Sequence, residues 1–253
     1  MLYVAYACLC LFVFAVGAVI GSFLNVVVYR LPRKINVAKG FSFCPACEHR
    51  LYPKDLIPLF SYLFLGGKCR YCKAKISPRY FLVETLAGAA LLLFCIGFGL
   101  PAAILYFAVF SCLLCITLID ADTQEIPDSL NLAILICGVA AIWVQADVSL
   151  LSRFIGLFVI SLPLFLISLI ISGAFGMGDV KLMFAAGFLL GWQHALVAFF
   201  IALLLGGVYG VIVLATRKKG RKDHFAFGPC LAAGICVALL CGEEILRIYL
   251  ATM

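Results

Sequence analysis

Two aspartates stand at the ends of strongly apolar segments, where a charged side chain needs a partner or a task. Asp120 ends the apolar run 112–119, and Asp179 begins another apolar segment. An isolated ionised carboxylate is costly to bury, so such groups are normally paired, neutralised or functional. If the two carboxylates approach closely, they share a proton, and one can activate water while the other protonates a carbonyl oxygen. This pair would have the chemistry of an aspartic protease.

The residues around Asp179 predict a site that a peptide backbone can approach. Gly176 and Gly178 lack Cβ atoms, so we expect unusual backbone angles and close approach of a substrate there. Lys181 is expected to belong to the cytoplasmic entrance of this site. Short glycine patterns are weak evidence in a chain with 22 glycines. A structural polar pair, or a proton or ion relay in a transporter, is the alternative interpretation of the two acids.

Four cysteines are spaced as metal ligands. Cys44 and Cys47 form one CxxC pair, and Cys69 and Cys72 form a second after 21 intervening residues. Two such pairs can complete a tetrahedral site of four thiolates, which leaves no position for water and is therefore structural. We expect zinc here rather than two disulfides, because the loop is predicted to face the reducing cytoplasm.

Other polar residues have simpler interpretations. Cys112 and Cys115 also form a CxxC, but they lie in an apolar segment and are expected to be small buried hydrophobic residues. Asp128 follows Pro127 at the start of another apolar segment, where a carboxylate favours the N-terminus of a helix. We therefore expect Asp128 to cap that helix.

The composition identifies the elements that must position these residues. The chain has 253 residues, of which 66% are hydrophobic and 12% charged, far from the balance of a soluble domain. Its apolar runs have the length of helices and do not alternate with period two. The sequence therefore predicts an all-α polytopic membrane protein with about eight transmembrane helices, at 3–29, 80–98, 101–120, 128–145, 154–172, 179–191, 194–215 and 226–250.

Basic residues predict the orientation of these spans. The loop 30–79 carries eleven lysines and arginines, and 216–224 carries five more. Basic loops remain in the cytoplasm, so the N-terminus is expected outside. Arg153 and Arg247 are the exceptions, in predicted external connections. With this topology, Asp120 and Asp179 both lie at the cytoplasmic edge of the membrane.

The net charge of +7 is explained mainly by this topology. A basic cytoplasmic face also suits anionic membrane lipid. No nucleic-acid motif accompanies the basic residues, so nucleic acid is not an expected partner.

Several stretches together resemble the bacterial prepilin peptidases, the type IV leader peptidase family, and more weakly the GxGD intramembrane aspartic proteases. They occur in the order of that family over nearly the whole chain. The matching stretches are 21–32 (GSFLNVVVYRLP), the two CxxC pairs, 77–80 (SPRY) with Glu84, 120–128, 176–181 (GMGDVK) and 227–229 (FGP).

This resemblance implies an activity and a substrate. The catalytic aspartates would be Asp120 and Asp179, and the enzyme would cleave the short basic leader of prepilins or pseudopilins at the cytoplasmic face of the bacterial inner membrane. It would be bifunctional, since many members also methylate the new N-terminal residue with S-adenosylmethionine, an activity associated with the N-terminal region. The matching positions Gly21, Asn25, Arg30 and Glu84 receive no role from the resemblance.

The predicted domains are a first helix at 1–29, a cytoplasmic zinc-binding domain at 30–79, and a seven-helix membrane peptidase domain at 80–253. Two other functions remain open from residues alone: a proton-coupled transporter with Asp120 and Asp179 as a relay, and a zinc-loop binding module with a membrane anchor.

Overall fold

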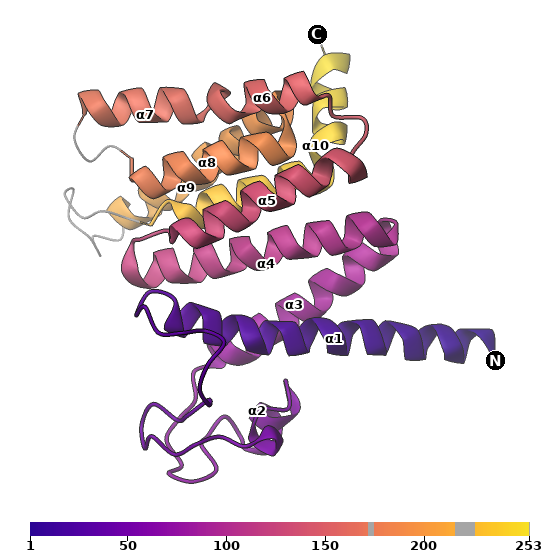
Figure 1. Ribbon diagram of the computed structural model, residues 1–253, viewed down its shortest axis with the longest axis vertical. Coiled ribbons are helices and arrows are strands. Elements are labelled where there is room, and N and C mark those ends of the chain that lie inside the picture. The colour runs from indigo at the N-terminus through magenta and orange to yellow at the C-terminus, as the bar shows by residue number, and fades with distance from the viewer. Residues whose placement is uncertain (172–174, 216–225, 253) are drawn as a thin grey trace. The chain divides into compact units, whose positions relative to one another are not determined.

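A computed structural model describes residues 1–171, 175–215 and 226–252, and its regular structure there is helical (Figure 1). The only extended pairings in these ranges are two isolated β-bridges. The prediction of an all-helical protein is confirmed at this level. The helices are α1 (Leu2–Arg30), the 3-10 helix η1 (Pro53–Asp55), α2 (Phe60–Phe64), α3 (Pro78–Gly97), α4 (Leu100–Thr123), α5 (Asp128–Val144), α6 (Leu150–Val159), α7 (Ser161–Ile170), α8 (Met177–Leu190), α9 (Trp192–Ala215) and α10 (Gly228–Ala251).

The chain divides into two compact units, Met1–Phe107 and Ala108–Met253. The first contains α1 to α3 and the start of α4, and the second contains the rest of α4 and α5 to α10. The division predicted from composition, at residues 29 and 79, stays a prediction.

Each of the eight predicted spans corresponds to helix, but within the described residues six helical segments are long and apolar enough to cross a membrane. Helices α5 and α8 have 17 and 14 residues, which is short for a bilayer core about 30 Å thick. The count of eight spans therefore stays a prediction. The basic segment 216–224, used to predict the orientation, lies outside the described residues.

The predicted span 154–172 begins earlier and is interrupted. Helix α6 starts at Leu150, and one residue, Ile160, separates it from α7. Pro163 has no N–H, and its ring clashes with the carbonyl group four residues earlier, that of Val159. The α-helix therefore ends at Val159 and restarts at Ser161.

In the first unit, α1 and α3 cross where glycines replace larger side chains. A Cβ atom on Gly21 would lie 2.8 Å from the Cβ of Ala87, and one on Gly88 would lie 2.8 Å from the ring of Phe14. The backbones can approach this closely only without those atoms, as is common between membrane helices.

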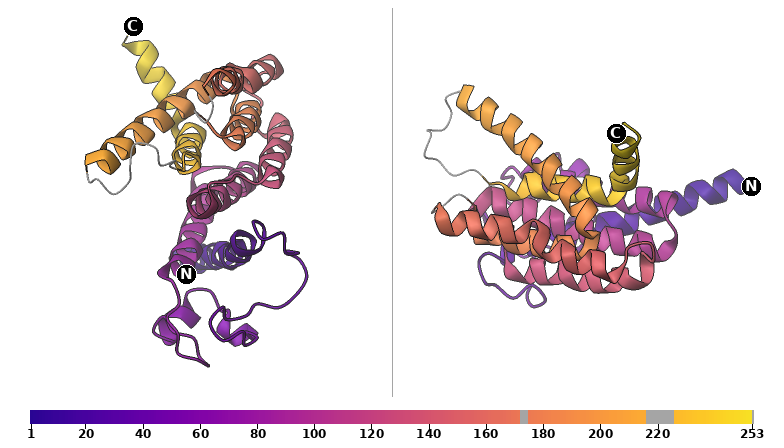
Figure 2. Two further views of the ribbon diagram at one scale, coloured as in Figure 1. Left: turned by 90° about the vertical axis from the view of Figure 1, so that its left-hand side faces the viewer. Right: turned by 90° about the horizontal axis from the view of Figure 1, so that it is seen from above.

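In the second unit, α8 packs against α5, α6, α7 and α9 (Figure 1, Figure 2). Ten of its 14 residues are buried. Gly156 of α6 and Gly187 of α8 meet backbone to backbone. Helix α8, which carries Asp179, is thus held from several sides.

Arg153 was expected in an external connection, but it lies in α6 and its side chain is completely buried. Its guanidinium donates to the carbonyls of Ala141 and Gln145 at the end of α5, at 3.1 and 3.2 Å. It also donates to those of Phe188 and Leu189 at the end of α8, at 3.3 and 2.8 Å. Carbonyls in the last turn of a helix lack intrahelical partners and favour a cation. One arginine therefore stabilises two helix C-termini.

Candidate active site and metal centre

Asp120 lies in the last turns of α4 and is only 5% exposed. Its Oδ2 accepts a hydrogen bond of 2.9 Å from the backbone N–H of Gly228, the first residue of α10. The C-terminus of α4 disfavours a negative charge, whereas the N-terminus of α10 favours it. The start of α10 therefore supplies the donor and the dipole that a buried carboxylate at position 120 needs.

Asp179 lies in the first turn of α8 and is 8% exposed. Its Oδ2 accepts a hydrogen bond of 3.2 Å from the N–H of Gly176, while its own N–H donates to the carbonyl of Gly176 at 3.0 Å. The Asp120 carboxylate is near enough for its charge to act on Asp179. The two acids singled out from the sequence are thus both buried, both held by backbone donors, and within electrostatic range of each other.

Two aromatic rings accompany these backbone donors. Phe175 precedes Gly176 and Phe227 precedes Gly228, and their ring centroids lie 5.9 Å apart. The Phe227 ring also covers Gly206 of α9, where a Cβ would lie 2.8 Å from it. Residues 227–229 belonged to the sequence resemblance, but nothing in their types indicated that Gly228 donates to Asp120.

The expectation of unusual backbone angles at Gly176 and Gly178 is wrong. Gly176 has extended angles, with φ −69° and ψ 144°, and Gly178 lies within α8. Neither has a positive φ. The reason for glycine at 178 is packing, because a Cβ there would lie 2.9 Å from the Cβ of Ile126. A Cβ on Gly176 would lie 3.3 Å from Oδ2 of Asp179, so this glycine leaves room for the carboxylate.

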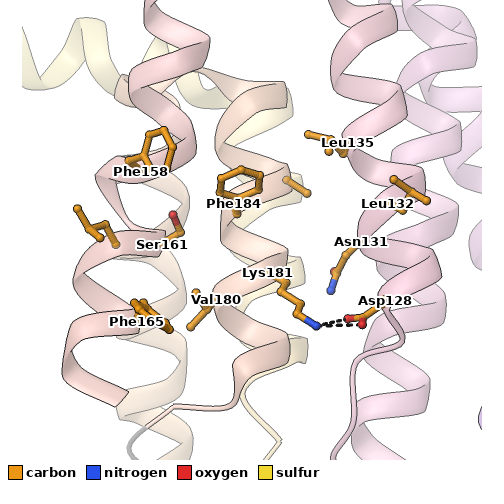
Figure 3. Close-up of a pocket in the computed structure, with 12 residues that line it drawn as sticks. Asp128, Asn131, Leu132, Leu135, Phe158, Ser161, Phe165, Val180, Lys181 and Phe184 are labelled. Atoms are coloured by element: carbon orange, nitrogen blue, oxygen red, sulfur yellow. Dashed lines mark hydrogen bonds and ion pairs between the residues drawn. The ribbon is translucent and has the colours of Figure 1, made fainter. Parts of the chain in front are cut away.

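Lys181 forms an ion pair that the sequence did not predict. Its Nζ lies 2.8 and 2.9 Å from the two carboxylate oxygens of Asp128 (Figure 3). Asp128 is the first residue of α5 and makes no side-chain cap, since Pro127 occupies the N-cap position. The expectation that Asp128 caps this helix is therefore wrong. The carboxylate still lies in the first turn, where the helix dipole favours it.

This ion pair lies at one end of a cavity of about 470 Å³ between α5, α6, α7 and α8 (Figure 3). Its walls are mainly apolar, with Phe158, Phe165 and Phe184 among them. Asn131 is 6% exposed, and neither polar atom of its amide has a hydrogen-bond partner within the described residues. The cavity thus contains one polar group that an occupant could satisfy.

The four predicted metal ligands come together in the first unit. The sulfur atoms of Cys44, Cys47, Cys69 and Cys72 all lie within 4.8 Å of one another, and Sγ of Cys44 and Sγ of Cys72 are 3.8 Å apart. Sulfurs at the corners of a tetrahedron with metal–sulfur bonds of about 2.3 Å are separated by about 3.8 Å. The cluster fits a tetrahedral metal ion, and the described cysteines form no disulfide.

The two CxxC pairs have the same local structure. In each, the N–H of the first cysteine donates to a carbonyl five residues later, that of His49 or Ala74. The residue four positions after that cysteine, Glu48 or Lys73, donates back to its carbonyl and has a positive φ. Isolated β-bridges, 43 with 50 and 68 with 75, close both turns. Each turn therefore presents two sulfurs in the same way.

Backbone donors act on one of these sulfurs. The N–H groups of Cys72 and Tyr71, with the sulfurs of Cys72 and Cys44, lower the pKa of the Cys69 thiol to about 7, whereas desolvation and the same two sulfurs raise the pKa of Cys47 to about 12. A lowered pKa favours the thiolate, which is the form that binds a metal. Electrostatics at Cys69 are thus suited to a metal ligand.

A buried carboxylate organises the loop between the two pairs. The Asp55 side chain is 2% exposed and accepts from Arg70 at 2.6 Å and from the hydroxyl of Tyr71 at 3.0 Å. Desolvation raises the pKa of Asp55, but these bonds and the N–H of Tyr52 outweigh it and hold the pKa below its usual value. Asp55 therefore ties η1 to the second CxxC turn.

Residues that matched the family without a role have defined positions. Arg30 is 6% exposed and donates to the carbonyls of Asn36, Val37, Lys39 and Phe41, at 2.7 to 3.4 Å. These hydrogen bonds hold the segment that follows α1 against the end of that helix.

Asn25 and Glu84 connect elements of the same unit. Nδ2 of Asn25 donates to the carbonyl of Tyr80 at 3.4 Å. The Glu84 carboxylate, 8% exposed on α3, accepts from the N–H of Leu59 at 2.7 Å. Glu84 thus attaches the segment before α2 to α3.

Two family models match the chain. The model of the bacterial peptidase A24 N-terminal domain matches residues 15–98, and the model of the type IV leader peptidase family matches residues 107–211. The first match contains the cysteine cluster, and the second contains Asp120 and Asp179.

Curated relatives are similar over almost their whole length. A protein named prepilin leader peptidase/N-methyltransferase from Pseudomonas aeruginosa is 36% identical over 92% of this chain and 91% of its own length. Proteins of the same name from Aeromonas salmonicida and Bacillus subtilis are 33% and 32% identical, each over 95% of this chain and over 94% and 96% of their own lengths. No solved structure matches the chain.

Proposed function

Because the chain belongs to the type IV leader peptidase family, we propose that it cleaves the leader of prepilins or pseudopilins and methylates the new N-terminus. The relatives carry the names of both activities, as the sequence resemblance predicted. Nothing in these names or in the structure supports the transporter alternative.

The observation that carries the peptidase proposal is the pair of buried aspartates. Asp120 and Asp179 come from different helices, interact electrostatically, and each retain one carboxylate oxygen beside the one that accepts a backbone N–H. Fixed donors of this kind hold catalytic groups in place before the substrate binds. We assign catalysis to these two residues.

The chemistry is hydrolysis by water. One carboxylate takes a proton from water, and the water oxygen attacks the scissile carbonyl carbon while the other carboxyl group protonates the carbonyl oxygen. The C–N bond of the tetrahedral intermediate then breaks, and the leaving amine takes up a proton. The products are the leader carboxylate and a new α-amine.

The flanking residues have supporting roles in this proposal. Gly176 and Gly178 allow the Asp179 carboxylate and the segment before α5 to pack closely. Lys181 belongs to the cytoplasmic entrance through its pair with Asp128.

Single substitutions of each acid test this assignment. Asp120→Asn and Asp179→Asn preserve shape but remove the ability to share a proton, and we expect each to abolish leader cleavage in membranes containing a prepilin substrate. Mass spectrometry of the substrate would measure cleavage position and methylation together. Cleavage by either variant at the wild-type rate would exclude that residue from the chemistry.

The second reaction uses the amine that cleavage produces. Bound S-adenosylmethionine would supply an electrophilic methyl group. That methyl group would pass to the nitrogen of the new α-amine, and S-adenosylhomocysteine and a proton would be the other products. The α-amine has a pKa of about 8, so a fraction of it is unprotonated at neutral pH.

The remaining assignments follow from topology and ligand type. We propose zinc for the cysteine cluster, where four thiolates exclude water and the ion stabilises a loop with little apolar core. We propose eight spans in the bacterial inner membrane, with the N-terminus outside, the peptidase site at the cytoplasmic face, and membrane lipid as surroundings.

A further inference from the structure

The loop between the two CxxC pairs carries an exposed apolar surface. The range 56–67 contains no charged residue. Four of its large apolar side chains are between 49% and 84% exposed, and they are Ile57, Phe60, Leu63 and Phe64. Positions 57, 60 and 64 have the spacing of one helix face, and the rings of Phe60 and Phe64 stack with centroids 6.3 Å apart. Large apolar side chains gathered in this way mark an interaction surface.

Two contacts hold this surface beside α3, which is long and apolar enough to cross a membrane. The N–H of Leu59 donates to the carboxylate of Glu84 at 2.7 Å. The ring of Tyr62 lies 5.5 Å from the ring of Phe81, measured between centroids. The segment around α2 therefore packs against the first two turns of α3.

These contacts give the surface a depth. Helix α3 has 20 residues, which is about 30 Å of helix and matches the thickness of a hydrocarbon core. The helix begins at Pro78, so Glu84 lies about 9 Å along it. In Figure 1, α2 lies back along the length of α1 rather than beyond the C-terminal end of that helix. The surface thus lies at the depth of the membrane boundary.

We propose that residues 56–65 form an interfacial anchor, whose exposed apolar side chains enter the cytoplasmic leaflet of the membrane. This assignment rests on α1 and α3 crossing the membrane, as proposed above. The rest of the loop 30–79, with its cysteine cluster, stays in the cytoplasm. Lipid is the occupant because the neighbouring surface of α3 has the same character: Leu82 and Leu86 are 55% and 50% exposed and belong to the candidate span.

The backbone of the anchor is suited to lipid. Hydrocarbon cannot accept a hydrogen bond, so N–H groups at this depth need acceptors within the protein. The N–H groups of Phe60, Ser61, Leu63 and Leu65 donate to carbonyls inside the segment. Leu59 has a φ of 63° where the chain turns into α2, and its N–H donates to Glu84 instead. Glu84 therefore satisfies a backbone donor that would otherwise face lipid.

Charged residues border the anchor on both sides. Lys54 and Lys68 are exposed there, and lysines beside an inserted segment are attracted to anionic headgroups. Asp55 lies at the same border, but its carboxylate is 2% exposed and paired with Arg70. An apolar face flanked by lysines is typical of a segment that lies in the plane of a membrane surface.

Tryptophan fluorescence of the full-length chain in nanodiscs tests this proposal. The two native tryptophans, Trp143 and Trp192, are first replaced by phenylalanine. Interfacial segments lie about 5–10 Å deep, so brominated phospholipid should quench the Phe64→Trp variant at least about twofold. Tyr52→Trp is the matched control, because Tyr52 is 47% exposed in the same loop but lies outside the anchor. Its fluorescence should respond to acrylamide in the water and little to brominated lipid.

The outcomes separate the anchor from the proposed topology. Quenching of the Phe64→Trp variant by acrylamide alone would mean that the surface faces water. Protection from both quenchers would mean that protein covers it, and either result would overturn the anchor. Failure of brominated lipid to quench Trp143 and Trp192 in the wild-type chain would instead contradict the membrane placement of the helices.

A second pair of variants measures what the anchor does. Phe60→Ser combined with Phe64→Ser removes both stacked rings, and we expect trypsin in nanodiscs to cleave after Lys54 and Lys68 at least about fivefold faster, because the apolar contact with lipid is lost. Ile35 is 45% exposed in the same loop but outside the anchor, so Ile35→Ser is the control and should be cleaved at the wild-type rate. Equal cleavage of all three proteins would count against insertion of the loop.

Discussion

Gly228 lies directly against the Asp120 carboxylate, although 108 residues separate them in the chain. Its N–H donates to Oδ2 at 2.9 Å, and a Cβ on Gly228 would lie 2.7 Å from the same oxygen. Cβ atoms essentially never come that close to another heavy atom. Any residue except proline would supply this N–H, so it is the space in front of the donor that favours glycine at this position.

We expect Gly228→Ala to lower leader cleavage by about 100-fold, because a catalytic group displaced by about 1 Å loses activity of that order. The added methyl would push the Asp120 carboxylate away from its donor. The initial rate of cleavage of a prepilin substrate in membranes would measure the effect.

Gly207→Ala is the matched control for this substitution. Gly207 lies in α9, and a Cβ there would meet nothing within 4 Å. Cleavage by this variant should stay within twofold of wild type. Wild-type cleavage by Gly228→Ala would show that the position of Asp120 is not set by this contact.

The helices of this protein could be predicted from the sequence because apolar runs of helical length identify them locally. The start of α10 was placed within a few residues, and 227–229 stood out as part of the family resemblance. The contact of Gly228 with Asp120 could not be predicted, since it depends on how α4 and α10 pack. Types and spacing indicate which acids are unusual, but not which backbone groups they accept from.

The errors have the same physical origin. Gly178 was expected to adopt unusual backbone angles, whereas it is helical and packs against Ile126 from another segment. Asp128 was interpreted as a helix cap, whereas its carboxylate meets Lys181, 53 residues away. Local preference placed Asp128 correctly in the first turn of its helix, whereas Gly178 was predicted just before a helix that in fact begins at Met177. Tertiary packing then decided what each one touches.

Lys181 and Asp128 should contribute little to stability. Their side chains are 49% and 72% exposed, and exposed ion pairs are worth about 0–1 kcal/mol. A double-mutant cycle with Lys181→Met and Asp128→Asn should therefore give a coupling free energy below about 1 kcal/mol. Unfolding by denaturant in detergent would measure it.

The same variants examine the role of Lys181 in catalysis. We expect Lys181→Met to keep cleavage within about fivefold of wild type, which corresponds to about 1 kcal/mol. Loss of all cleavage, with the protein still folded, would mean that Lys181 contacts the substrate or the reacting atoms.

The cluster of four cysteines should hold one zinc ion per chain. Cys44→Ser and Cys72→Ser should each reduce the metal content of the purified protein and expose the loop 44–72 to proteolysis, because the loop depends on the ion. Elemental analysis and limited proteolysis would measure both effects.

Cys115→Ala provides the control for the metal cluster. Cys115 is also part of a CxxC, but it is buried in α4 and lies outside the cluster. This variant should keep the full metal content. A wild-type protein that contains no metal and resists thiol reagents at all four cluster positions would contradict the zinc assignment.

Arg153 should be the most important single charge for the stability of the second unit. Its guanidinium donates to backbone carbonyls at the ends of both α5 and α8, and hydrogen bonds to a charged group contribute about 1.5–3 kcal/mol each. Arg153→Met should therefore lower the free energy of unfolding by about 2–5 kcal/mol. Arg153→Lys should recover little of it, because one ammonium cannot serve the ends of two helices as a planar fork does.

The matched control for Arg153 is Arg247→Met, which removes an exposed arginine from α10. Substitutions at such positions normally change stability by less than about 0.5 kcal/mol. Denaturant unfolding of both variants in the same detergent would compare them. Equal stabilities would mean that the carbonyls at the ends of α5 and α8 are satisfied without Arg153, and that its burial in α6 has another cause.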